Sequence, residues 1–153
     1  MNLALTDVEL KSISRLAWVD AAKKNAPPIA ATNLLAISKT AREMPSAASA
    51  EPRDVIHYLS RGSNYLGAGI LVLICMLAVE TDGDYPPMDR KFASGLRAQK
   101  KISLKDLERL NGKNLTEFAK VYVHKVIPAW CETRKGRSPE EADRFWGCGG
   151  TDG

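Results

Sequence analysis

The sequence predicts an all-α protein, a compact single-domain bundle of several helices around one buried central helix. Residues 65–79 are almost wholly apolar, which is typical of a helix surrounded by other helices. Elsewhere apolar residues recur at helical spacing, and no stretch shows the alternation of a β-strand bounded by turns. A chain of 153 residues suits one domain with a substantial core. We expect this domain to span residues 1–147, followed by a disordered tail at 148–153.

Two helices and a loop are expected before the central region. The run TDVE at residues 6–9 is a capping-box pattern followed by apolar residues at helical spacing, so a first helix should span about residues 7–24. Pro27-Pro28 breaks this helix, and a second helix should end near Glu43. The small and polar stretch 44–50 is typical of a flexible loop.

The central helix should form the second arm of a helical hairpin. Pro52 suits the first turn of a third helix, which would carry Val55 and Leu59 toward the core. A tight polar turn at 61–64 would then lead into the apolar helix. Because residues 62–79 carry no charge, a membrane span is the alternative. The strongly apolar part is shorter than the ~20 residues that a bilayer core requires, so a buried helix is favoured.

Two short helices are expected next. Pro86-Pro87 forces an extended backbone, and this puts Asp89 at the N-cap or in the first turn of the following helix. Ser103 and Asp106 are typical of the cap of another helix, which Asn111-Gly112 would end.

The last part of the chain predicts two more helices. One is long and amphipathic, and Pro128 should kink or stop it. Ser138-Pro139 would cap the last, short helix. The inward face of the long helix is marked by Leu115, Phe118, Tyr122 and Val126.

The charge and the cysteine content indicate which binding partners and which cellular compartment suit this protein. The formal charge of +4 and the pI near 9.0 suit a polyanionic partner. The three cysteines form no C-x-x-C pair and have no zinc-ligand spacing, so no metal or cofactor is expected. The first residues, MNLALTDVELK, lack the basic and apolar regions of a signal peptide. These features favour the reducing cytoplasm and no membrane association.

Two motifs resemble those of the helix-hairpin-helix DNA glycosylases. The run LSRGSNYLGAGIL at residues 59–71 is similar to the hairpin and second helix of that superfamily, whose usual pattern is L-P-G-x-G-x-x-T-A-x-x-[IV]-L. The run YPPMD at residues 85–89 falls where the superfamily has a [VF]-P-[IV]-x-D segment that ends in the catalytic aspartate. The motifs have the family's order and about its separation. The hairpin and the catalytic segment would together occupy residues 53–97.

The chain departs from the family pattern at several positions. The two hairpin glycines would fall at Arg61 and Ser63, which leaves only Gly62 in the turn and would reshape the backbone that cradles a DNA phosphate. Tyr65 stands where bifunctional members carry a Schiff-base lysine. The cysteines are too few for the iron–sulfur cluster of some relatives. The resemblance therefore implies a monofunctional, hydrolytic glycosylase without a cofactor.

The resemblance implies catalytic roles for two residues. Asp89 would stabilise the oxocarbenium-like sugar while the N-glycosidic bond of a flipped nucleotide breaks. Tyr65 would line the base pocket and contact the extruded base. The alternative for Asp89 is a plain helix N-cap worth about 1 kcal/mol. The alternative for Tyr65 is an aromatic residue at the rim of the core.

DNA contacts are expected at the hairpin and on the helices after it. The backbone N–H groups of Gly62, Ser63 and Asn64 would bind a phosphate at a helix N-terminus. The basic side chains of this region would neutralise phosphates on one face, unless they form only a solvated surface. These basic residues are Arg61, Arg90, Lys91, Arg97, Lys100, Lys101 and Lys105.

The remaining aromatic and imidazole side chains give weaker signals. Trp18, Trp130 and Trp146 are expected in the core or in a lid over the site. His57 and His124 show no metal-ligand or nucleophile arrangement, and structural roles are expected for both.

The function that the sequence favours is that of a DNA-binding protein resembling a monofunctional base-excision N-glycosylase. Such a protein binds duplex DNA, flips out a damaged or mismatched base, and hydrolyses its N-glycosidic bond. One alternative is a non-catalytic DNA-binding module of the same fold. Another is a helical protein-interaction or immunity-type domain, in which the two motifs have no functional meaning.

Overall fold

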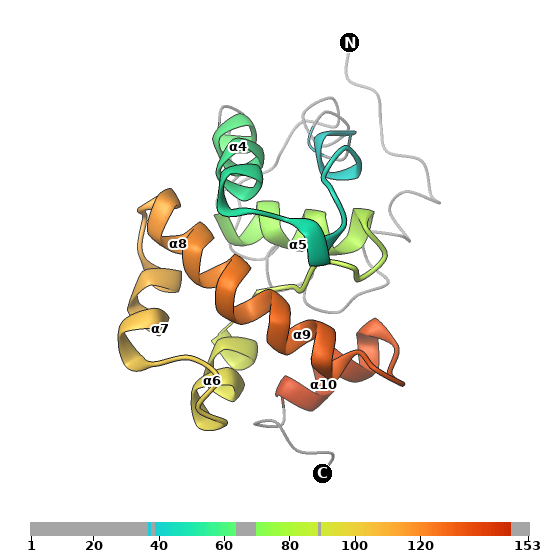
Figure 1. Ribbon diagram of the computed structural model, residues 1–153, viewed down its shortest axis with the longest axis vertical. Helices are drawn as coiled ribbons and strands as arrows, with labels where there is room; N and C mark the ends of the chain where they lie inside the picture. The colour runs from blue at the N-terminus through green and yellow to red at the C-terminus, as the bar shows by residue number, and fades with distance from the viewer. Residues whose placement is uncertain (1–36, 38, 64–69, 89, 148–153) are drawn as a thin grey trace.

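The computed structural model describes residues 37, 39–63, 70–88 and 90–147, and these residues form helices and connections without a strand (Figure 1). This confirms the all-α class for the described part of the chain. The expected helix at 7–24 lies outside it, and the second helix ends at residue 42, close to the expected end. The later elements are the 3-10 turn η1 (Ala47–Ser49), α4 (Pro52–Ser63), α5 (Ile70–Glu80), α6 (Arg90–Ala98), α7 (Leu104–Asn111), α8 (Leu115–Val121), the π-helix η2 (Tyr122–Val126), α9 (Ile127–Thr133) and α10 (Pro139–Gly147).

Helix α5 is the buried centre that the apolar run predicts. Leu73, Ile74 and Leu77 are at most 1% exposed. The Tyr58 hydroxyl of α4 donates a hydrogen bond to the Leu73 carbonyl, so α4 is tied to the middle of α5. Among the described residues no helix has both the length and the apolar character needed to cross a membrane.

Helices α8, η2 and α9 follow one another without a break and form the longest continuous rod in the described part of the chain (Figure 1). Pro128 lies in the first turn of α9. A proline there cannot donate to the carbonyl four residues back, and its ring would clash with that carbonyl in a regular α-helix. The backbone widens just before it, and the Ile127 N–H donates five residues back to the Tyr122 carbonyl. Pro128 therefore perturbs the helix, as expected, but does not stop it.

This rod holds the segment that connects α5 to α6. The Gly83 carbonyl accepts hydrogen bonds from Trp130 Nε1 at 2.8 Å and from Arg134 Nη1 at 2.6 Å. The Pro86 carbonyl accepts one from the Tyr122 hydroxyl at 2.6 Å. Gly83 has a φ of +80°, and a Cβ there would lie 2.4 Å from the Pro139 ring, so only glycine fits. Trp130 is fully buried, as one of its two expected locations requires.

The stretch 44–50 is ordered, and the prediction of a flexible loop there is wrong. It contains the η1 turn, and Asp84 accepts a hydrogen bond from the Ala47 N–H at 2.9 Å. The Tyr85 hydroxyl donates to the Pro45 carbonyl at 2.6 Å. Burial raises the pKa of Tyr85 far above its ordinary value, with smaller contributions from the negative charges of Asp84 and Asp54. The tyrosine therefore stays a hydrogen-bond donor.

Helices α6 and α7 pack along one side of the rod, α6 toward its α9 end and α7 toward its α8 end. Phe92 and Leu96 are buried on the inner face of α6, which also packs against α10. The Phe92 ring centroid lies 5.6 Å from that of Trp130. Helix α7 packs against α8 and begins with the expected cap, in which Ser103 Oγ accepts from the Asp106 N–H at 3.1 Å. The expected cap of α10 is also present, because Ser138 Oγ accepts from the Glu141 N–H.

The buried hydroxyl of Tyr122 gives a test of how the rod holds the connecting segment. Tyr122→Phe should lower the free energy of unfolding by about 1–3 kcal/mol, since the Pro86 carbonyl loses its buried donor. Chemical denaturation measures this. The control Thr116→Val removes an exposed hydroxyl from α8 and should change stability by less than about 0.5 kcal/mol. Equal effects of the two changes would contradict the proposed importance of the buried bond.

Candidate nucleic-acid interface

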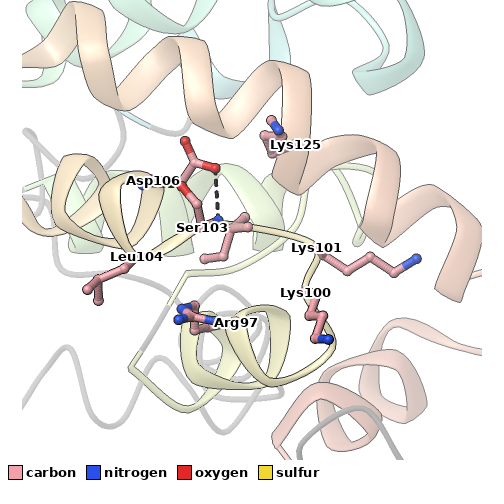
Figure 2. A pocket seen from close by; sticks show the side chains of 8 residues that line it. Arg97, Lys100, Lys101, Ser103, Leu104, Asp106 and Lys125 are labelled. Carbon is pink, nitrogen blue, oxygen red and sulfur yellow. Dashed lines mark hydrogen bonds between the residues drawn. The ribbon is translucent and has the colours of Figure 1, made fainter.

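An open pocket lies where α6 turns into α7, with a cavity volume of about 500 Å³. We call it the α6–α7 pocket (Figure 2). The end of α6, the α6–α7 connection and the start of α7 form most of its wall, and the π-helix η2 closes the other side. Its lining residues are Arg97, Lys100, Lys101, Ile102, Ser103, Leu104, Asp106 and Lys125.

Four cations surround this pocket. Arg97, Lys100, Lys101 and Lys125 are all exposed, and none forms an ion pair with a carboxylate in the described ranges. Among the lining residues one side chain, that of Asp106, is a carboxylate. Like charges gathered around a concave surface produce a positive potential that attracts anions.

The way α6 ends explains why two consecutive lysines, Lys100 and Lys101, line this pocket. Lys100 has a φ of +58°, and the Lys101 N–H donates back to the Leu96 carbonyl at 2.9 Å. This left-handed residue reverses the chain directly after the helix. The next residue, Ile102, is 3% exposed and anchors the connection in the core. The two lysine side chains are therefore presented on a fixed turn (Figure 2).

The charge of Asp106 is directed into the helix cap. Its Oδ2 accepts from the Ser103 N–H at 3.0 Å, and its Oδ1 accepts from Arg109 Nη1 at 3.3 Å. The pKa of Asp106 is lowered, chiefly by the hydrogen bond from the Ser103 backbone and further by the Ser103 hydroxyl and the charges of Lys125 and Arg109; partial burial opposes the shift. The carboxylate is thus ionised but already hydrogen-bonded.

A second pocket, with a cavity volume of about 340 Å³, adjoins the first and shares Asp106 and Lys125 with it. We call it the α8 pocket. It combines cations, carboxylates, an imidazole and an apolar side chain, and is open to solvent. Its lining residues are Asp106, Arg109, Glu117, Lys120, Val121, His124 and Lys125.

The expected hairpin turn is wrong for Arg61, Gly62 and Ser63. All three belong to the last turn of α4, whose C-terminal end leaves carbonyls rather than N–H groups unpaired. Gly62 is buried, and a Cβ there would lie 2.3 Å from Leu73 Cδ2, so this glycine allows α4 and α5 to approach closely. A phosphate cradle of Gly62 and Ser63 N–H groups is therefore not available. Arg61 is exposed but lines neither of the two pockets above.

The residues to which the resemblance assigns catalysis lie outside the described part of the chain. These residues are Asp89 and Tyr65. The expected phosphate contact Asn64 also lies outside it. Helix α6 begins at Arg90, so the helix expected after Asp89 is present. Arg90 and Lys91 form part of its first turn, whereas Arg97 and Lys100 reach the α6–α7 pocket from its other end.

Several lining residues did not stand out in the sequence. Lys125 closes the α6–α7 pocket from a helix distant in the chain, and local spacing does not predict that contact. Glu117, Lys120 and His124 share one face of the rod, since they are spaced by three, four and seven residues. The helical spacing of these polar residues can be recognised in the sequence, but it is equally typical of a solvent-exposed helix face that binds nothing. His57 and His124 are both exposed, and His124 lines the α8 pocket.

Metal binding has no basis among the residues that the structure describes, since no three His, Cys, Asp or Glu side chains there are grouped to hold an ion. Cys131 is partly exposed. Burial raises the pKa of its thiol, Asp84 raises it further, and Arg134 opposes the shift. The thiol form is therefore favoured, which disfavours a nucleophilic role.

The capping role of Asp106 predicts a pH-dependent contribution to stability. Asp106→Asn should lower the free energy of unfolding by about 1 kcal/mol at pH 7. A lowered folded-state pKa stabilises the fold above the unfolded value of ~3.9, and this contribution is lost as pH falls through the folded value. The difference between wild type and variant, measured by urea denaturation from pH 7 to 2.5, should shrink accordingly. Glu108→Gln, an exposed change in α7, serves as control, and a difference independent of pH would contradict the assignment.

No family model, no curated protein and no solved structure matches this chain. The resemblance to helix-hairpin-helix glycosylases thus rests on the runs at 59–71 and 85–89 alone. The described geometry of the first run differs from that family's hairpin at residues 61–63.

Proposed function

We propose that the protein binds DNA through contacts between the phosphate backbone and the α6–α7 pocket. The observation that carries this proposal is the set of four exposed cations around one open cavity, Arg97, Lys100, Lys101 and Lys125. The single carboxylate at this cavity is engaged in a helix cap.

A polyanion fits this surface better than a single small anion does. The cavity is wide and open, at about 500 Å³, and its cations come from α6, its following turn and η2. Cations distributed in this way can neutralise several phosphates and release their counterions, which is the main source of affinity in sequence-independent DNA binding. The net charge of +4 acts in the same direction over longer distances.

Salt dependence tests this proposal. In fluorescence anisotropy with a labelled duplex, log affinity should fall linearly with log salt, and Arg97→Gln with Lys101→Gln should reduce the magnitude of the slope by about 2. Lys39→Gln is the control for lost charge, since the helical segment at 39–42 lies at the opposite end of the molecule from α6 and α7 (Figure 1). It should leave the slope unchanged.

Two outcomes would contradict DNA binding at this pocket. If the control lowers the slope as much as the double variant does, the attraction is a general charge effect. If wild type binds no DNA at low salt, the proposal fails, and a helical protein-interaction domain becomes the better explanation.

Base excision is a second candidate function, in which Asp89 assists hydrolysis of an N-glycosidic bond and Tyr65 contacts the flipped base. It is supported by the YPPMD motif and by the start of α6 at the next residue, Arg90. The backbone that leads to this position is firmly held, because the Pro86 carbonyl accepts from the buried Tyr122 hydroxyl. The helical conformation at 61–63 argues for the non-catalytic alternative, which keeps DNA binding without turnover.

Excision is tested with duplexes that contain altered or mismatched bases. Wild type should produce abasic sites in at least one of them, and Asp89→Asn should lower the single-turnover rate at least about 100-fold, the scale of a lost electrostatic contact in the transition state. Asp82→Asn, an exposed change in the α5–α6 connection, should retain activity. DNA binding without product from any of these substrates would identify the non-catalytic module.

A further inference from the structure

The α8 pocket differs in chemistry from its basic neighbour. It holds a second carboxylate, that of Glu117, which would repel a phosphate, so the cations here do not simply extend the α6–α7 pocket. Asp106 is committed to the cap of α7, whereas the Glu117 carboxylate accepts no hydrogen bond from the described residues. The Val121 side chain adds an apolar surface to the same cavity. These features suit a flat, partly apolar group with hydrogen-bonding edges.

His124 supplies a ring for such a group. It is exposed, and within the described ranges its imidazole makes no hydrogen bond or ion pair. It lies three residues after Val121 and seven after Glu117, so the three side chains share one face of the rod. Aromatic and histidine rings are the usual surfaces on which unpaired bases stack. In an intact duplex the base faces are covered by their neighbours and cannot stack in this way.

We propose that the α8 pocket binds one unpaired nucleobase of a nucleic-acid strand whose phosphates occupy the α6–α7 pocket. This inference rests on the DNA binding proposed above. The base stacks on His124, and its exocyclic amino group donates to the Glu117 carboxylate, as cytosine N4 does to acidic side chains. Lys120 donates to a ring acceptor of the same base. The preferred partner is therefore single-stranded or locally unpaired DNA with cytosine or adenine at this position.

The arrangement of the two pockets supports a single strand that crosses both. They share Lys125 and Asp106 as a common wall, so a phosphate on one side and a base on the other belong to neighbouring parts of one nucleotide chain. The cavity volume of about 340 Å³ falls within the range of small-molecule pockets, about 300–1,000 Å³. The volume is therefore sufficient for a group of the size of one nucleobase.

The stacking role of His124 is tested with labelled 12-nucleotide oligo-dC and a 12-base-pair duplex at pH 7.5 and low salt. His124→Ala should weaken binding of oligo-dC at least about fivefold, the low end of the base-stacking range, and leave duplex binding within about twofold. His124→Phe should restore oligo-dC binding, because it keeps a ring and removes the imidazole nitrogens. A loss confined to the alanine variant distinguishes stacking from a lost charge or a structural effect.

The acceptor role of Glu117 is tested through base preference. Wild type should bind oligo-dC more tightly than oligo-dT, since thymine presents a carbonyl where cytosine presents its amino group. Glu117→Gln should reduce this ratio to about one, because an amide can donate as well as accept. The fold should be unaffected, as the Glu117 cap contact is made by its backbone N–H to Asn114 Oδ1.

The outcomes separate this inference from the proposal on which it rests. If wild type binds neither oligonucleotide nor duplex, DNA binding itself is refuted. If duplex and oligo-dC bind equally and His124→Ala changes neither, DNA binding stands and the base pocket is refuted. If stacking is seen but Glu117→Gln keeps the preference for oligo-dC, the assignment of Glu117 as acceptor is refuted.

Discussion

The structure depends on hydrogen bonds from the rod α8–η2–α9 to the segment between α5 and α6, whose buried carbonyls have no helical N–H groups as donors. Pro86 and Pro87 interrupt the helical pattern between α5 and α6, and this stretch lies in the interior. Its buried carbonyls must find donors elsewhere, since an unpaired buried carbonyl costs about 1–3 kcal/mol. Tyr122, Trp130 and Arg134 provide those donors. The same contacts fix where α6 begins and hence where its last turn presents cations.

One element serves the interior and the candidate site at the same time. On its inner side the rod carries Tyr122, whose ring stacks on Phe118 at 5.7 Å, and Trp130. On its outer side it carries His124 and Lys125, both within the π-helix. The π-turn relieves the clash that Pro128 would cause. The geometry of the pocket wall is therefore coupled to packing in the core.

The two pockets offer complementary chemistry for a nucleotide chain. The first gathers four cations and keeps its single carboxylate hydrogen-bonded, which favours phosphate. In the second, the Glu117 carboxylate has no partner among the described residues and lies beside an exposed imidazole, which favours a base. Because the two pockets share Asp106 and Lys125, one ligand can contact both of them at once. The proposed mode of binding does not require a helix-hairpin-helix turn, and residues 61–63 are helical.

The sequence by itself determined the features that depend on near neighbours in the chain. The cap of α7 by Ser103, the cap of α10 by Ser138, the burial of α5 and the non-helical stretch at Pro86-Pro87 are all local consequences of residue type. For the same reason the all-α class and most of the described helix boundaries could be predicted. Caps and prolines act within a few residues, and periodicity reports burial directly.

Only the tertiary structure decided the features made by distant partners. The turn at 47–49 is held by Asp84 and Tyr85, which lie 37 and 40 residues from the groups that they bind. Gly62, expected in a phosphate-binding turn, instead allows close contact with Leu73. Lys125 joins the basic pocket only because the rod crosses α6 and α7. No local pattern encodes these contacts, since their free energy is gained only when the helices pack together.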